Sequence, residues 1–436
     1  MRVSRLLLLS GAALALASCG NGTPADPSTQ YGADPTLPAP RQYLLPPMKV
    51  AEATPWTNGE MPTVAAGLKI APLATGLMHP RQPYVLPNGD VLIVESSGPA
   101  EPIHRPKDII MGLVQKQAGA AAKGGNRITL LRDTNGDGKP EVRTIFLDHL
   151  TSPFGVALVG HDLYVANTDA IMRYAYVDGA TKIDGAGTKL TDLPGGPINH
   201  HWTKSLVASA DGTKLYAGVG SNSNITENGI AAETGRAAIW EIDRATGAHR
   251  IFASGLRNPN GLTWNPQSGK LWAVVNERDE IGPNLVPDYM TSVQPGAFYG
   301  WPYSYYGQHI DARVRPQRPD LVAKAIAPDY ALSSHVAPLG LAFYTGANLP
   351  AQYRNGAFVG EHGSWDRSPF NGYKVVFVPF ADGKPSGPPR DIVTGFLDAQ
   401  QKHARGRPVG LAVDRTGGLL IADDLGNTVW RVTAAG

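Results

Sequence analysis

One pattern recurs six times along this chain: a proline or an aromatic residue, an apolar strand, a glycine-containing turn, and a second apolar strand. Alternating apolar positions on both sides of such a turn are typical of a β-hairpin. A single hairpin cannot bury its faces, whereas repeated hairpins packed side by side can. The six copies are residues 83–95, 153–167, 202–218, 259–276, 338–361 and 408–423.

Successive copies begin about 50 to 80 residues apart, a spacing that suits four-stranded blades joined by variable loops. The repeat therefore predicts an all-β fold, a six-bladed β-propeller, over residues 66–436. A strand near residues 67–77 is expected to pair with the last blade and close the ring. The alternative is a β-sandwich with accidental hairpin similarity, which the in-phase recurrence of glycine and strand pair disfavours.

Composition agrees with many short strands joined by turns. The chain has 50 glycines and 37 prolines, and only 17% of its residues are charged, which favours little helix. Its 39 basic and 37 acidic residues give a formal net charge of +2. Because phosphate binding needs a concentrated basic surface, this balance argues against nucleic acid as a partner.

The N-terminal segment reads as an export signal. Residues 1–19 begin with two arginines and continue with an apolar run that is too short to span a membrane. The signal ends in Leu16-Ala17-Ser18-Cys19, similar to a bacterial lipobox, and Cys19 is the only cysteine. We expect an exported protein held by lipid at the periplasmic side of a membrane; an ordinary cleaved signal would leave it periplasmic or secreted. Residues 20–65 are rich in Pro and Gly, which predicts a flexible tether.

A pair of histidines, His200 and His201, stands just before the third hairpin. A neutral imidazole at that place could take a proton from a substrate hydroxyl at neutral pH. Adjacent residues in extended chain point to opposite faces, so only one should face the channel. The alternatives are two hydrogen-bonded loop histidines, or part of a metal site.

Three arginines stand at hairpin entrances in this nearly neutral protein. Arg257 and Asn258 open the fourth hairpin, and Arg405 and Arg407 open the sixth. Residues two apart on an extended strand share a face, so Arg405 and Arg407 would need an anion between them. The alternative is a solvated basic edge. Together, the three guanidinium groups predict a cavity built for a polyanion.

Two acidic stretches offer hard oxygen ligands of the kind calcium prefers. Residues 276–302 include Glu277, Asp279 and Glu280, and could form a calcium site or an acidic surface loop. Residues 133–141 begin like a calcium loop but have Thr144 where a bidentate glutamate is expected. For this second stretch a turn between blade strands is the better prediction, and a weak structural calcium site stays open as the alternative.

At these positions the chain resembles the soluble pyrroloquinoline-quinone-dependent glucose/sorbosone dehydrogenase family, in particular its sorbosone-type branch. The similarity runs in order from about residue 70 to about residue 432, and a six-bladed propeller is that family's architecture. The matching segments are His201 with Leu206-Val207 and Asp211-Gly212, Gly255–Pro259 with Gly261-Leu262, Tyr299–Pro302, Arg405-x-Arg407, and His362–Arg367.

The resemblance implies an oxidoreductase that oxidises an aldose, sorbosone or a similar alcohol or aldehyde. Hydride would pass to bound pyrroloquinoline quinone (PQQ) while His201 removes the hydroxyl proton as general base. Arg257 and Asn258 would contact the quinone, and Arg257 would stabilise its developing negative charge. An electron acceptor of unknown identity would take the electrons onward.

The resemblance also implies how the cofactors would be held. Arg405 and Arg407 would bind cofactor carboxylates. Arg367 or Lys374 would stand in for a lysine of the glucose enzymes that has no clear counterpart here. Calcium would bind near Glu277, Asp279 and Glu280 and act as a Lewis acid.

Two other classes stay open: a calcium-dependent lactonase-like propeller hydrolase and a non-catalytic propeller that binds a partner. A lactonase gives no reason for three channel arginines, and a binding module would tolerate alanine at His201 and Arg257. The sequence contains no nucleotide-binding glycine loop, no H-E-x-x-H and no G-x-S-x-G, which disfavours nucleotide cofactors, zinc proteolysis and serine hydrolysis.

Overall fold

The computed structural model describes residues 25–41, 49–57, 59–100, 112–113, 116–119 and 122–436. The predicted export signal with Cys19 lies outside the described residues. Within these residues, no helix combines the length and the apolar character needed to cross a membrane.

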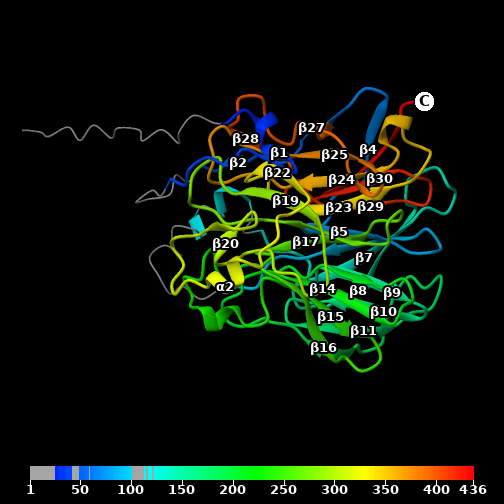
Figure 1. Ribbon diagram of the computed structural model, residues 1–436. Coiled ribbons are helices and arrows are strands. Elements are labelled where there is room, and N and C mark those ends of the chain that lie inside the picture. The colour runs from blue at the N-terminus through cyan, green and yellow to red at the C-terminus, as the bar shows by residue number, and fades with distance from the viewer. Residues whose placement is uncertain (1–24, 42–48, 58, 101–111, 114–115, 120–121) are drawn as a thin grey trace, which may run out of the picture.

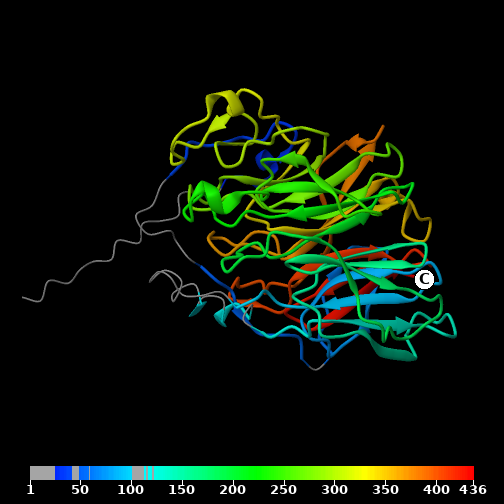
Figure 2. The same ribbon diagram turned by 90° about the horizontal axis from the view of Figure 1, so that it is seen from below.

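Six antiparallel sheets surround one axis, and each sheet is built on one of the six predicted hairpins (Figures 1 and 2). The prediction of an all-β, six-bladed propeller is confirmed. The inner strand pairs are β5 (Pro80–Val85) with β6 (Val91–Glu95), β9 (Gly155–Val159) with β10 (Asp162–Ala166), β13 (Leu206–Ala208) with β14 (Lys214–Val219), β17 (Pro259–Trp264) with β18 (Leu271–Val275), β23 (Pro338–Tyr344) with β24 (Gly356–Glu361), and β29 (Pro408–Val413) with β30 (Leu419–Asp423).

Two further strands complete each blade. They are β7 (Arg127–Arg132) and β8 (Val142–Leu147), β11 (Ala170–Ala175) and β12 (Thr188–Asp192), β15 (Ala238–Asp243) and β16 (His249–Ser254), β19 (Pro287–Ser292) and β22 (Tyr330–Ser334), β25 (Lys374–Ala381) and β27 (Arg390–Thr394), and β31 (Thr428–Ala434) and β4 (Leu68–Ala74). The last pair joins the two ends of the propeller, with Val432 opposite Ile70. The predicted ring closure is therefore confirmed.

The second strand of each hairpin is more uniformly buried than its alternating sequence pattern suggests. All five residues of β6 and all five of β18 are buried. A blade in a propeller packs against a neighbour on both faces, so these strands have no solvent-facing side. The apolar core consequently lies between the blades and extends around the ring.

The described part of the predicted tether lies on the propeller. Helical turn η1 (Pro27–Gln30) leads into β1 (Tyr31–Gly32), which pairs with β22. Strand β2 (Glu52–Ala53) pairs with β28 (His403–Ala404), and β3 (Thr63–Val64) pairs with β27. Strands β1 and β3 cover blade edges that would otherwise be exposed, so this part of the tether predicted over 20–65 is laid over the domain surface.

The chain between β19 and β22 leaves the fourth blade. This insertion contains β20 (Ser304–Tyr305), β21 (His309–Ile310) and α2 (Pro319–Val322), and it lies on the same side as β1, β2 and β28 (left in Figure 1). The Tyr306 hydroxyl donates to the carbonyl oxygen of Gly32 at 3.1 Å. The remaining short elements are η2 (Ile230–Glu233), η3 (Ala351–Tyr353) and β26 (Lys384–Pro385).

Candidate functional site

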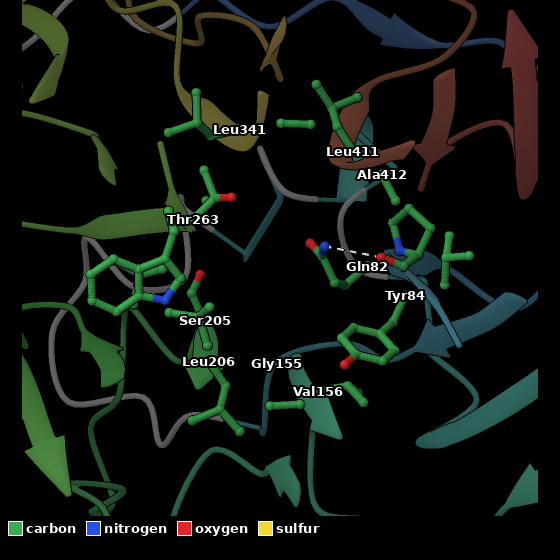
Figure 3. Close-up of a pocket in the computed structure, with 18 of the residues that line it drawn as sticks. Gln82, Tyr84, Gly155, Val156, Ser205, Leu206, Thr263, Leu341, Leu411 and Ala412 are labelled. Carbon is green, nitrogen blue, oxygen red and sulfur yellow. Dashed lines mark hydrogen bonds between the residues drawn. The ribbon is translucent and has the colours of Figure 1, made fainter. Parts of the chain in front are cut away.

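A cavity of about 550 Å³ is lined by residues of all six innermost strands (Figure 3). Its lining includes Gln82, Tyr84, Ser205, Thr263 and Leu341, and none of the described residues that line it is charged. An uncharged cavity offers no compensation for a polyanion. None of the predicted site residues lines it.

The predicted site residues lie at the other end of the same strands. His201 comes before β13, Asn258 directly precedes β17, and Arg407 directly precedes β29. Direct contacts join these residues: Arg257 acts on the pKa of His201, and Asn258 meets His201 across Gly220. Arg81 lies over the ring of Trp202 and pairs with Asp424, whose backbone N–H bonds to the carbonyl oxygen of Arg407. The fold therefore brings His201, Arg257, Asn258 and Arg407 to one channel mouth.

His201 has the tautomer that a general base needs. Its Nδ1 lies 2.8 Å from the carbonyl oxygen of Ser221, and a carbonyl only accepts, so Nδ1 carries the hydrogen and Nε2 keeps a lone pair. Burial and the guanidinium of Arg257 lower the pKa of His201 well below its ordinary value. The imidazole is consequently neutral at neutral pH and able to accept a proton at Nε2.

Arg257 is held entirely by protein acceptors. The guanidinium is buried, and its five N–H groups meet the carbonyl oxygens of Asn224, Asn276 and Glu277, the side-chain oxygen of Asn224, and Oδ2 of Asp279. These bonds leave no N–H for the quinone contact that the resemblance implied. Arg257 can therefore act on the mouth through its charge, as it does on the pKa of His201.

Asn258 meets His201 across a glycine. A Cβ on Gly220 would lie 2.4 Å from the Cβ of His201 and 2.5 Å from Oδ1 of Asn258, so only glycine allows this approach. Asn258 is 6% exposed, and its Oδ1 has no hydrogen-bond partner among the described residues. A buried amide oxygen beside the base is thus available to a bound group.

Arg405 and Arg407 do not share a face. Arg407 is buried with its guanidinium 5.4 Å from the Tyr373 ring centre, and its Nε has no hydrogen-bond partner in the described structure. Arg405 is half-exposed and lies 3.6 Å from Glu60. The prediction that both hold one anion is not supported for Arg405, because residues 405–407 form a bend between β28 and β29 instead of a strand.

Arg81, the second residue of β5, was missed by the sequence reasoning. Its guanidinium pairs with Asp424 and lies over the rings of Phe154 (5.8 Å) and Trp202 (5.4 Å). Its Nε also has no hydrogen-bond partner among the described residues. The sequence does indicate this position, because Arg81 stands at the entrance of the first hairpin as Arg257 and Arg407 do at the entrances of theirs. The repeat, however, places the start of the first hairpin at Pro83, two residues after Arg81.

Asp424 also lies close to two histidines. His362 Nε2 lies 3.0 Å and His79 Nε2 3.7 Å from its Oδ2. Burial alone would raise the pKa of Asp424, but His362, His79 and Arg81 hold it well below its usual range. Asp424 is consequently ionised, and it offsets part of the positive charge of Arg81 and Arg407.

The segment His362–Arg367 runs from Asp424 to the other side of the mouth. His362 faces Asp424, whereas Asp366 lies 3.2 Å from Nδ1 of His335. Arg367 is 2% exposed and donates to the carbonyl oxygen of Pro283 at 3.0 Å and to the Ser334 hydroxyl. Its Nη1 holds these loops together, whereas its Nε has no hydrogen-bond partner among the described residues, so its role as a cofactor ligand stays a prediction.

The three predicted calcium ligands do not converge. Glu277 is buried, and its Oε2 accepts from the backbone N–H of Arg278. Asp279 faces Arg257 and His335, and Glu280 lies 3.9 Å from Arg313. Neighbouring residues in irregular backbone point in different directions, so their closeness in sequence did not make one site. Burial raises the pKa of Glu277 to about 7.

Two groups of three potential metal ligands occur among the described residues. One is Asp133, Asp137 and Glu141, exposed in the β7–β8 connection, where Asp133 accepts from the backbone N–H groups of Gly136 and Gly138. The preferred prediction of a turn at this place is confirmed.

The other group is Asp279, His335 and Asp366, at the channel mouth. Burial lowers the pKa of His335, but the carboxylates of Asp366 and Asp279 outweigh it and raise that pKa to about 9.

Fold and site together define a six-bladed propeller with a base and buried guanidinium groups at one mouth of its channel. The family model for glucose/sorbosone dehydrogenases matches residues 77–363, and a second model, TrAA12-like, matches residues 317–435. The chain belongs to the glucose/sorbosone dehydrogenase family, and this membership makes it an oxidoreductase by class.

Individual relatives are distant. The chain is 28% identical over 295 residues to an uncharacterized protein of Borreliella burgdorferi, covering 65% of this chain and 76% of that protein. It is 24% identical over 366 residues to a pyrroloquinoline quinone-dependent pyranose dehydrogenase of Coprinopsis cinerea, covering 72% of this chain but only 44% of that protein. The solved holo PQQ domain of the Coprinopsis pyranose dehydrogenase superposes with a TM-score of 0.69 at 20% identity, over 88% of this chain and 100% of that domain.

Replacing Arg367 by methionine tests whether this residue is structural. Removing it takes a charged donor from the Ser334 hydroxyl and from the Pro283 carbonyl oxygen, which keeps only the bond from Ser334. We therefore expect a loss of about 2–3 kcal/mol in the free energy of unfolding. Chemical denaturation measures it, and Arg318→Met, which breaks an exposed pair with Asp320, should change it by less than about 1 kcal/mol. Unchanged stability combined with weaker quinone binding would make Arg367 a cofactor ligand.

Proposed function

We propose that the protein is a PQQ-dependent dehydrogenase that oxidises an aldose, sorbosone or a similar sugar-like alcohol or aldehyde at the channel mouth. Family membership supports the oxidoreductase class, and the Coprinopsis relative supports the quinone by its name. The observation that carries the proposal is the neutral imidazole of His201, with Nε2 unprotonated, at a mouth that also holds buried guanidinium groups.

The residues at the mouth fit a planar tricarboxylate quinone. Arg407 and Arg81 are buried, and their Nε–H groups lack acceptors among the described residues, although each such group costs free energy if it stays unpaired. A carboxylate is the acceptor that a guanidinium prefers. Oδ1 of Asn258 adds an unpaired acceptor beside the base. Of the residues predicted to contact the cofactor, Arg407 and Asn258 keep that role, and the role of Arg367 stays a prediction.

PQQ, when bound, supplies a two-electron acceptor for the hydride of the substrate carbon. His201 takes the hydroxyl proton at Nε2, while the Ser221 carbonyl fixes the ring through Nδ1. Burial and the charge of Arg257 keep the imidazole neutral before that transfer by lowering its pKa. The imidazolium formed afterwards is disfavoured by the same guanidinium, so the proton leaves readily and the base is restored.

Calcium does not fit the ligand set predicted for it. Glu277, Asp279 and Glu280 point to different partners, and the carbonyl oxygens of Asn276 and Glu277 already accept from Arg257. The guanidinium group of Arg257 therefore occupies the cation position at this loop. We assign no step of the reaction to a calcium ion held by these three residues.

Substrate, electron acceptor and location are part of the same proposal. The substrate is a small sugar-like molecule, an electron carrier that we do not identify reoxidises the quinone, and no nucleic acid takes part. Export and a lipid on Cys19 would hold the propeller at the periplasmic side of a membrane.

Titration with PQQ tests the cofactor assignment. Isothermal titration calorimetry of the cofactor-free protein should give one site per chain. Arg407→Met should weaken binding roughly tenfold to a hundredfold, because a charged hydrogen bond to a buried carboxylate is lost.

Arg405→Met is the matched control, since Arg405 is half-exposed and paired with Glu60. It should change the affinity by less than about threefold. Equal losses in both variants would contradict the assignment of the anion site to Arg407.

Replacing His201 tests the base. Turnover of aldoses with an artificial electron acceptor should fall by about 10²–10⁴ in His201→Ala, whereas His309→Ala, in the exposed strand β21, should keep it. The depressed pKa means that His201 stays unprotonated as the pH falls. We expect kcat/KM to stay level from pH 8 through about 6.5 and to fall only at more acidic pH; an acid limb centred at or above 6.5 would argue against His201.

The Cys19 assignment is tested by cell fractionation. Cys19→Ser removes the thiol that would carry the lipid, so the variant should leave the membrane fraction while the unmodified chain stays in it. Equal distribution of both proteins in the soluble fraction would mean that Cys19 carries no anchor.

A further inference from the structure

Three ligand atoms from different loops converge beside Arg257. Nδ1 of His335 lies 3.3 Å from Oδ1 of Asp279 and 3.2 Å from Oδ1 of Asp366, and one ligand atom from each of the three residues lies within 4.8 Å of the others. Asp279 follows β18, His335 follows β22 and Asp366 follows β24. His335 and Asp366 are 5% and 6% exposed.

The hydrogen bond made by Nε2 of His335 determines whether Nδ1 of a neutral ring presents a hydrogen or a lone pair to the two carboxylates. Nε2 of His335 lies 3.0 Å from the carbonyl oxygen of Gly282, and a carbonyl only accepts, so Nε2 carries a hydrogen. A neutral ring would then present the lone pair of Nδ1 to two carboxylate oxygens. That arrangement is repulsive at this distance, so either one proton, on Nδ1 or on a carboxyl oxygen, or a metal ion must lie among the three atoms.

A proton satisfies only part of the group. On Nδ1 it serves Asp279, whose Oδ1 accepts the hydrogen bond. Oδ1 of Asp366 is buried, and despite its nearness to His335 it has no hydrogen bond to any described residue. A buried carboxylate oxygen without a partner is costly, whereas one divalent ion would accept lone pairs from all three residues.

The separations also suit one ion. Adjacent ligands of a six-coordinate ion at about 2.3 Å lie about 3.3 Å apart, close to the 3.2 and 3.3 Å seen here. We propose that Asp279, His335 and Asp366 bind one divalent cation. This site shares only Asp279 with the calcium ligands predicted from the sequence, and it replaces Glu277 and Glu280 by two residues far away along the chain.

The ion would position the catalytic mouth without touching the reacting atoms. Asp279 offers Oδ1 to the ion and Oδ2 to Arg257 at 3.2 Å, so an ion that fixes this carboxylate also fixes the guanidinium next to His201. The imidazole nitrogen favours Mn²⁺ or Zn²⁺, whereas Ca²⁺ prefers oxygen ligands. We therefore expect both transition ions to bind more tightly than Ca²⁺.

Metal binding to the full chain tests the proposal. The chain is stripped with a chelator, dialysed in turn against Mn²⁺, Zn²⁺ and Ca²⁺ without quinone, and its metal content is measured by mass spectrometry. We expect one ion per chain and at least about tenfold weaker binding in Asp366→Asn. Asp137→Asn, in the exposed β7–β8 group, is the matched control and should leave this site unchanged.

Three results would overturn the site: no bound ion, equal binding in Asp366→Asn, or loss of the ion in Asp137→Asn instead. If Asp366→Asn fails to fold, the unmodified chain still decides, because Mn²⁺ at this site has one directly bound imidazole nitrogen. Pulsed electron paramagnetic resonance should show modulation from that nitrogen, and its absence would contradict the proposal. Since no quinone is needed, failure here is distinguishable from failure of the proposed dehydrogenase function.

Discussion

The common direction of the six innermost strands is the constraint on which the rest of the structure depends. All six line one uncharged cavity, and the loops that lead into them with His201, Asn258 and Arg407 carry the charged mouth. His201, Asn258 and Arg407 are far apart along the chain and come together for this reason alone. The channel consequently has one neutral mouth and one mouth rich in charged side chains, and only the second suits an anionic cofactor.

Charge at that mouth is balanced by bridging carboxylates. Asp279 joins Arg257 to His335, and Asp424 joins Arg81 to His362 and His79. These bridges allow guanidinium and imidazole groups to lie close together, because the carboxylates offset the repulsion and the desolvation that unpaired cations would suffer. Arg257 is the clearest case, because protein acceptors hold all of its N–H groups and its charge still adds to the effect of burial in lowering the pKa of His201. His201 and its neighbours thus form one electrostatic unit.

Local patterns predicted the fold well. Hairpins, turns and the strand that closes the ring depend on neighbouring residues and on periodicity, so all six blades could be located from the sequence. Residues at hairpin entrances were placed correctly at the mouth for the same reason. Arg405 was not, because a bend at residues 405–407 breaks the two-residue period on which its orientation was based.

Features that depend on distant contacts could not be predicted. Local sequence gives no indication that other loops accept from every N–H group of Arg257, or that Arg367 donates to Pro283 and Ser334. It gives none either that His335 and Asp366 converge on Asp279. The pairing of β1 and β3 with blade edges was hidden in the same way by a Pro- and Gly-rich composition.

A crystal structure of the protein soaked with PQQ tests the central claim most directly. The account predicts density for one planar quinone at the charged mouth, with a carboxylate at Arg407 and its reactive face toward Nε2 of His201. Density in the uncharged cavity around Gln82 and Ser205, or none at saturating cofactor, would contradict it.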